Sequence, residues 1–244
     1  MKSLKLIHVS AISTGIVIFL GMLMVIPSYI QPTSPQFFLL SFSVYENVEQ
    51  SWCDDLASTL KKYNIQATIF FSGKIAEKFP ECIKTFPNNV DIGSQMYHYV
   101  SLTTIPDYTL QLKEIQRGKQ AVDNAGNLNS RLFKAPYGTT DENIYSLLTR
   151  SNILVDFSYN DQYNKYYNGQ FIKFQLKSYN GTNNSVEFFR NLPTNEPIVI
   201  NFDSSTPVNY IDNFISKIKS KNTIFLDASE LTGLQLTIRN EGMT

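Results

Sequence analysis

The chain has 244 residues, of which 43% are hydrophobic, 13% aromatic and 17% charged, and its 21 basic residues balance 21 acidic ones. This length suits one sizeable globular domain with a short appendage. The zero net charge and the scattered lysines and arginines argue against a nucleic-acid-binding protein, so we expect no nucleic-acid partner.

The N-terminal segment carries the pattern of a membrane-directed sequence. Lys2 and Lys5 precede an apolar run over residues 11–30, and about 20 apolar residues suffice to span a bilayer. Residues 1–30 are therefore expected to form either a retained membrane anchor or a signal peptide that is removed. Because the positive residues come first, the rest of the chain is expected outside the cytoplasm, membrane-anchored in the first case and secreted in the second. Residues 31–36, with two prolines, are expected to be a linker.

Apolar, β-favouring runs then alternate with amphipathic segments. Strands are predicted over residues 37–44, 66–71, 90–93, 131–135, 153–158, 197–203 and 223–227. Helices are predicted over residues 52–63, 73–86, 107–125, 139–150, 185–190 and 208–220, the second of them kinked or split by Pro80. The polar stretch 159–184, rich in Tyr and Asn, is expected to be a loop or hairpin that contains one strand. This alternation predicts a parallel α/β sheet or barrel.

The chain contains two cysteines, Cys53 and Cys82. In an oxidising compartment they would form a disulfide. Two free, half-buried thiols are the alternative, and the sequence leaves both open.

Three sequence segments carry a family resemblance. They are LKKYNIQATIFF at 60–71, DIGSQMYHY at 91–99 and KAPYG at 134–138. In order and spacing they resemble the polysaccharide deacetylases of the NodB-homology type, carbohydrate esterase family 4. The resemblance covers residues 37–230 and leaves 231–244 as a C-terminal tail, for which a weak terminal helix or strand is expected. It implies an α/β fold, an irregular (β/α) barrel preceded here by one N-terminal hydrophobic helix.

The resemblance also implies five chemical positions, and each holds a different residue here. The aspartate base becomes Ser43 and the zinc-binding aspartate becomes Val44, while the two zinc-binding histidines become Gln95 and Tyr99, and the general-acid histidine becomes Phe202. Valine has no ligand atom, Gln and Tyr are poor zinc ligands, and Ser and Phe do not transfer protons near pH 7. We therefore expect a catalytically inactive domain that binds no cofactor.

Two further positions belong to the turn that stabilises charge in the family. There an arginine orients the base, and the backbone N–H of the tyrosine in a Pro-Tyr-Gly turn helps to hold the oxyanion. Here Lys134 replaces the arginine and lacks its planar fork. The turn itself is kept, so Tyr137 is the candidate oxyanion-binding residue, and a purely structural turn is the alternative.

Several aromatic and amide residues map to the mouth of the expected barrel. Aromatic faces stack on sugar rings, so a cleft that has lost its metal still predicts a domain that binds glycans, with cell-envelope polysaccharide as the partner. The alternative is that these rings fill the vacated pocket. The candidate residues are Tyr45, Gln95, Tyr97, His98, Tyr99, Pro136, Tyr137, Asn160 and Asn201.

A different class of function stays open. The chain would be an active hydrolase of carbohydrate metabolism, removing N- or O-acetyl groups from a polysaccharide, if a rebuilt site held zinc. Glu46, Asp91, His98 and Asp203 are the groups that would gather at the strand ends for that purpose. A purely structural surface protein is the third alternative.

Overall fold

The computed structural model of the chain describes residues 34–46, 48–140, 143–158, 162–192, 196–220 and 222–240. The segment expected to be an anchor or signal, residues 31–33 of the expected linker, and Asn160 lie outside these ranges. Within the described ranges, none of the helices has the length and apolar character needed to cross a bilayer.

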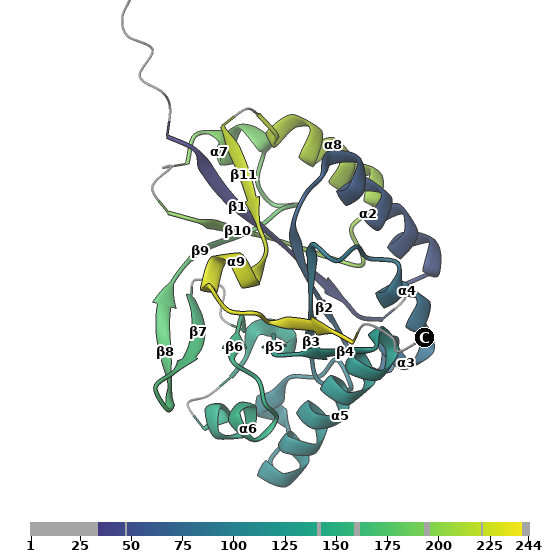
Figure 1. The fold of residues 1–244 in the computed structure, drawn as a ribbon, viewed down its shortest axis with the longest axis vertical. Coiled ribbons are helices and arrows are strands. Elements are labelled where there is room, and N and C mark those ends of the chain that lie inside the picture. Colours follow the sequence, from purple (N-terminus) through teal and green to yellow (C-terminus); the bar gives the residue numbers. More distant parts are fainter. Residues whose placement is uncertain are drawn as a thin grey trace, which may run out of the picture. The chain divides into compact units, whose positions relative to one another are not determined.

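Within the described residues, ten strands form one nearly closed, barrel-like sheet (Figure 1). Its order is β8-β7-β6-β5-β3-β2-β1-β10-β9, and β11 also pairs with β1. The strands are β1 (Gln36–Val44), β2 (Ala67–Phe71), β3 (Val90–Ser94), β5 (Leu132–Phe133), β6 (Val155–Asp156), β7 (Gln162–Tyr167), β8 (Gln170–Gln175), β9 (Lys177–Asn180), β10 (Ile198–Asp203) and β11 (Thr223–Leu226). All pairs are parallel except β6–β7 and β7–β8. The predicted α/β barrel is confirmed.

Helices follow most of the parallel strands and cover the outside of the sheet (Figure 1). They are α2 (Gln50–Tyr63), α3 (Gly73–Lys78), α4 (Pro80–Lys84), α5 (Tyr108–Gly126), α6 (Ile144–Arg150), α7 (Val186–Arg190), α8 (Val208–Ile218) and α9 (Ala228–Thr232), with 3-10 turns at η1 (Leu102–Thr104) and η2 (Pro136–Gly138). Pro80 begins α4 and separates it from α3, because proline lacks the N–H that a continuous helix needs.

One expectation about the second half of the chain is wrong. The polar stretch 159–184 contains three strands, β7, β8 and β9, rather than one. The tail from residue 231, where a terminal helix or strand was expected, contains a strand. There β12 (Thr237–Arg239) pairs with β4 (Leu128–Ser130), and Leu236 is fully buried. Both pairings depend on partners distant in the chain, which local patterns do not report.

Apolar side chains pack on both faces of the sheet. On β1, Leu39 belongs to the interior cluster with Phe70 and Leu132, whereas Leu40 and Phe42 belong to the cluster under the helices. Successive side chains of a strand point to opposite faces. This alternation determines which side chains at the end of β1 point into the barrel.

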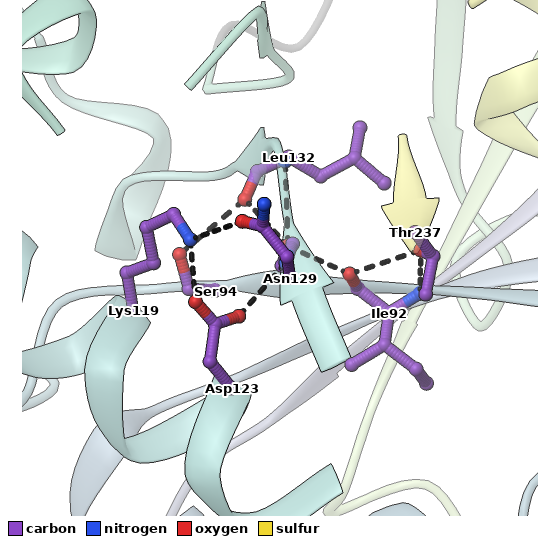
Figure 2. Close-up of polar contacts among 8 residues, drawn as sticks. Ile92, Ser94, Lys119, Asp123, Asn129, Leu132 and Thr237 are labelled. Atoms are coloured by element: carbon purple, nitrogen blue, oxygen red, sulfur yellow. Dashed lines mark hydrogen bonds and ion pairs between the residues drawn. The ribbon is translucent and has the colours of Figure 1, made fainter. Parts of the chain in front are cut away.

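A buried polar network holds α5 against the sheet (Figure 2). Lys119 forms an ion pair with Asp123 at 2.5 Å and donates to Asn129 Oδ1 at 2.9 Å. Asp123 accepts from the backbone N–H of Ser130, whose hydroxyl donates to the Ile92 carbonyl at 2.7 Å. One side of α5 is therefore fixed to β3 and β4.

A disulfide joins two of the outer helices. Cys53 on α2 is bonded to Cys82 on α4, with their Cα atoms 5.4 Å apart. Both residues are fully buried. Of the two states that the sequence left open, the structure has the disulfide.

A buried carboxylate at the end of β6 predicts a stability that depends on pH. Asp156 is fully buried, and burial raises its pKa to about 6 although Ser158 donates two hydrogen bonds to it. The unfolded value is about 3.9, so the native state holds more protons between roughly pH 4 and pH 6, and stability falls as the pH rises through that window. Between these pH values, the free energy of unfolding of Asp156→Asn is expected to fall by about 2–3 kcal/mol less than that of the wild type.

Urea unfolding from pH 4 to pH 7 measures the effect. The pKa of Asp227 is also raised to about 6, first by burial and then by the charge of Asp91. The Asp156→Asn variant should therefore keep part of the pH dependence of stability. The exposed Asp55→Asn serves as the control and should leave the wild-type slope unchanged. An Asp156→Asn slope equal to that of the wild type would contradict the prediction.

Candidate functional site

The interior of the barrel is polar near the carboxyl ends of its strands. Lys134 directly follows β5, and its ammonium donates to Asn201 Oδ1 on β10 at 2.9 Å and to Ser41 Oγ on β1 at 3.3 Å. Asn201 in turn donates to Ser178 Oγ at 2.6 Å. Lys134 therefore bridges strands on opposite sides of the barrel instead of orienting a base.

The environment of Lys134 weakens its hold on the proton. Burial lowers its pKa to about 8, and the nearby Asp203 carboxylate opposes the change. The ammonium nitrogen also lies 5.6 Å from the centroid of the Phe70 ring. Lys134 is therefore easier to deprotonate than an exposed lysine.

Three tyrosines close the mouth above this polar interior. The rings of Tyr45 and Tyr99 stack with centroids 3.8 Å apart and an interplanar angle of 11°. The ring of Tyr137 packs against Tyr99 with a centroid distance of 5.0 Å. Tyr99 is the residue at the position of the second zinc-binding histidine in the resemblance, so aromatic packing now occupies that place.

The phenols of this stack stay neutral at physiological pH. Burial raises the pKa of Tyr99 to about 12, although the backbone N–H of Tyr137 partly opposes the rise. Burial, followed by the Asp203 carboxylate, raises the pKa of Tyr45 as well. A phenol that keeps its proton is a poor ligand for a metal ion.

The Pro-Tyr-Gly turn has a strained backbone. Tyr137 lies in the left-handed region at φ 59° and ψ 6°, and Gly138 follows it at φ 68°. Non-glycine residues seldom adopt such angles unless the surroundings enforce them. The backbone N–H of Tyr137 lies near the Tyr99 hydroxyl.

The remaining metal positions do not offer zinc ligands either. Val44 is fully buried in the apolar cluster under the helices. Gln95 is fully buried, and neither atom of its amide has a hydrogen-bond partner in the described part of the chain. Among the described residues, no three His, Cys, Asp or Glu side chains form a group able to hold a metal ion. A valine, a sequestered amide and a neutral phenol do not fit the donor set of a zinc site.

Phe202 does not lie in the cleft, which corrects its assignment to the acid position. Its ring packs against Phe42 and Phe214 with centroid distances of 5.7 and 5.3 Å, under the helices. The alternation of β10 turns Asn201 and Asp203 inward instead. Asp203 is the register partner of Ser43 on β1, so these two residues occupy the mouth. The period-two pattern of residues 199–203 was the sequence signal that Asp203 faces the same side of the strand as Asn201.

The groups proposed for a rebuilt site do not gather. The Nδ1 atom of His98 lies 3.1 Å from Glu114 on α5, and its side chain is 48% exposed. Asp91 sits near the opposite end of β3, where it accepts from the Ser229 backbone N–H at 2.6 Å. Of the proposed acid, base and ligand groups, the geometry supports Asp203 at the mouth and places His98 and Asp91 elsewhere.

Two of the glycan-binding candidates are likewise directed elsewhere. The Tyr97 hydroxyl donates to Glu77 on α3 at 2.6 Å, and the Arg117 guanidinium lies 3.4 Å above its ring. Pro136 is buried under its turn. The rim residues that can meet a ligand are therefore Tyr45, Tyr99 and Tyr137.

Comparisons with known proteins agree with this barrel fold. The family model described as polysaccharide deacetylase matches residues 31–154. The peptidoglycan-N-acetylglucosamine deacetylase of Bacillus cereus is 27% identical over 97 residues, which cover 39% of this chain and 35% of that relative. The match thus spans about a third of that relative's length.

Two solved structures illustrate the likeness of the fold. A family 4 carbohydrate esterase from Streptomyces lividans has a TM-score of 0.59 at 17% identity, covering 78% of this chain and 91% of that chain. A family 4 pseudoenzyme from Bacillus anthracis has a TM-score of 0.56 at 13% identity, covering 81% and 66%. Deacetylases of this family are generally metal-dependent. The chain belongs to the polysaccharide deacetylase family, the NodB-homology type of carbohydrate esterase family 4.

Proposed function

We propose that this chain is a catalytically inactive polysaccharide deacetylase-like domain that binds cell-envelope glycan at its barrel mouth. The observation that carries the proposal is the stack of Tyr45 on Tyr99 at 3.8 Å, at the place of a metal ligand, beside a buried Val44. Its relative from Bacillus cereus supports the class of glycan. The pseudoenzyme among similar folds supports the loss of activity, and the apolar run at residues 11–30 supports a place outside the cytoplasm.

The glycan would bind on the rim instead of in a deep pocket. Tyr137 is 65% exposed and is held in a fixed turn against Tyr99. An aromatic face that is already ordered loses little entropy when a sugar ring packs on it. Gln95 is buried and Asn201 is engaged by Lys134, so neither amide is expected to contact the glycan.

Metal content and acetate release test the loss of activity. The full chain, incubated with zinc and then desalted, is expected to retain no stoichiometric metal and to release no acetate from an acetylated glycan. The reason is that no residue at the three ligand positions supplies an imidazole or carboxylate. Stoichiometric zinc that disappears in His98→Ala would overturn the proposal.

Co-sedimentation with purified peptidoglycan tests the binding. Tyr137→Ala is expected to weaken binding about five- to tenfold, since it removes one aromatic contact of about 1 kcal/mol. Tyr167→Ala is the matched control, because Tyr167 on β7 is 54% exposed and lies outside the stack. Equal losses in the two variants, or no binding by the wild type, would contradict glycan recognition at the rim.

One observation favours an active hydrolase as the second candidate. Lys134, with a pKa lowered to about 8 by burial, is able to exchange a proton near neutral pH, and Asp203 lies nearby. If the chain removes acetyl groups with this rebuilt pair, Lys134→Met should abolish acetate release. Under the leading proposal the wild type releases none.

A further inference from the structure

Two asparagine sequons lie where β9 leads into α7. Asn180-Gly181-Thr182 begins at the last residue of β9, and Asn183-Asn184-Ser185 ends at the residue before α7. The pattern Asn-x-Ser/Thr, with any residue except proline at x, is the acceptor of N-linked glycosylation in exported proteins. Because such triplets also occur by chance, the surroundings of each asparagine decide whether it can react.

The side chains of the first sequon leave the reactive nitrogen without a competing bond. Asn180 is exposed, and its Oδ1 atom accepts from the backbone N–H of Thr182 at 2.8 Å and from the Thr182 hydroxyl at 2.6 Å. The same hydroxyl has a longer contact of 3.4 Å to Asn183 Oδ1. The Nδ2 atom of Asn180, to which a sugar would be attached, donates to no other described residue. Both printed bonds of this amide therefore use its oxygen.

The backbone of the first sequon is fixed to the body of the domain at its middle residue. Gly181 is buried, its N–H donates to the Asn201 carbonyl at 2.8 Å, and its carbonyl accepts from the Tyr210 hydroxyl at 3.1 Å. A Cβ atom on this glycine would lie 2.2 Å from the Phe202 ring. The glycine therefore lets the loop lie close against β10, while the residues on either side of it stay exposed in the folded protein.

The second sequon is arranged differently. Ser185 is the N-cap of α7, and its hydroxyl accepts from the Phe188 N–H at 3.2 Å. Since the motif requires a hydroxyl at its third position, a transferase must engage that hydroxyl. At Ser185 this would cost the helix its cap, which is worth about 0.5–2 kcal/mol, whereas the Thr182 hydroxyl contacts only the two asparagines. Asn180 is therefore the better acceptor of the two.

Two features of the chain favour the compartment in which this modification takes place. Lys2 and Lys5 precede the apolar run at residues 11–30, the pattern of a segment that directs a chain into or across a membrane. Cys53 and Cys82 form a disulfide, a bond that persists in oxidising compartments. These two observations are independent of the sequons, and both agree with the export that is part of the proposed function.

We propose that Asn180 is a site of N-linked glycosylation. The sugar donor is an oligosaccharide joined through pyrophosphate to a membrane lipid, and a transferase outside the cytoplasm catalyses the transfer. The Nδ2 atom forms a bond to the anomeric carbon and gives one proton to a base of the transferase. The bond from that carbon to the pyrophosphate oxygen breaks, and the lipid pyrophosphate leaves with the electron pair. The inference rests on the export in the proposed function and does not depend on glycan binding at the tyrosine rim.

Peptide mass spectrometry of the full chain, purified from the cells that produce it naturally and from their medium, tests the proposal. Trypsin cleaves after lysine and arginine and releases residues 178–190, which contain both sequons. Fragmentation should locate an added sugar mass on Asn180 in most copies and none on Asn183. Asn180→Gln and Thr182→Ala should each return the peptide to the mass calculated from its sequence. Thr182→Ser keeps the hydroxyl and should keep the sugar, and Asn183→Gln is the matched control that should also keep it.

Protease treatment of cells stripped of their wall separates the failure of this proposal from the failure of the proposed function. A domain that the protease reaches, with residues 178–190 at their calculated mass, would overturn glycosylation and leave the proposed function in place. A domain shielded from the protease would overturn both. Sugar on Asn183 alone, or sugar that persists in Thr182→Ala, would also overturn the proposal. Modified Asn180 in a chain that does not co-sediment with peptidoglycan would support this site and contradict glycan recognition at the rim. Thermal melts of each variant verify folding.

Discussion

Phe70→Ala is expected to lower the free energy of unfolding by about 3–5 kcal/mol, the largest effect of any single substitution considered. Phe70 is fully buried in the interior cluster, and its ring lies 5.8 Å from that of Phe157. Its loss leaves a cavity in the middle of the barrel that strands β1, β2 and β3 cannot collapse to fill. Chemical unfolding in urea, monitored by tryptophan fluorescence, measures the change.

Gly93 provides the control for this prediction. A Cβ atom at Gly93 would lie 2.3 Å from Phe70 Cδ1, so the glycine is what leaves room for the ring. Gly93→Ala alone should therefore destabilise by about 1–3 kcal/mol through overpacking. Combined with Phe70→Ala, it should cost much less, because the clashing ring is gone. Strictly additive costs would show that the two residues do not contact one another.

Loss of the Cys53–Cys82 disulfide is expected to cost about 3–4 kcal/mol, the second largest effect. The bond closes a loop with a sequence separation of 29 residues, and opening it returns that conformational entropy to the unfolded chain. It ties α2 to α4, the helices that follow β1 and β2 on the outside of the barrel. The urea midpoints with and without reductant give the difference.

A double variant makes the disulfide experiment specific. In Cys53→Ala with Cys82→Ala the reductant should have no further effect on the midpoint. Because both sulfurs are fully buried, this variant should be at least as unstable as the reduced wild type. Identical midpoints for the oxidised and reduced wild type would contradict the prediction.

The proposed loss of the metal site and the tyrosine stack have one physical explanation. Protein interiors are close-packed, and a barrel mouth without a metal ion and its ligands has space that must be filled. The stacked rings of Tyr45 and Tyr99 fill it, and the hydroxyl of Tyr99 faces the Tyr137 N–H that would otherwise bind an oxyanion. In the function that we propose, Tyr99 therefore both takes the place of a metal ligand and completes the packing of the mouth.

The sequence by itself determined the family and the order of most elements. Local signals are sufficient for these features. Asp107 caps α5 by accepting from the backbone N–H groups of Thr109 and Leu110, and Pro80 separates α3 from α4. Such signals act over a few residues, so they can be identified without knowledge of the fold.

Only the tertiary structure decided which side chains share the mouth. A shift of one residue along a strand turns a side chain to the other face, and this distinguishes Asp203, at the mouth, from Phe202, under the helices. The pairing of His98 with Glu114 and the folding of β12 onto β4 depend on contacts between segments far apart in the chain. Sequence patterns report the period of a strand or helix, whereas the partners that fix its orientation are supplied by the rest of the fold.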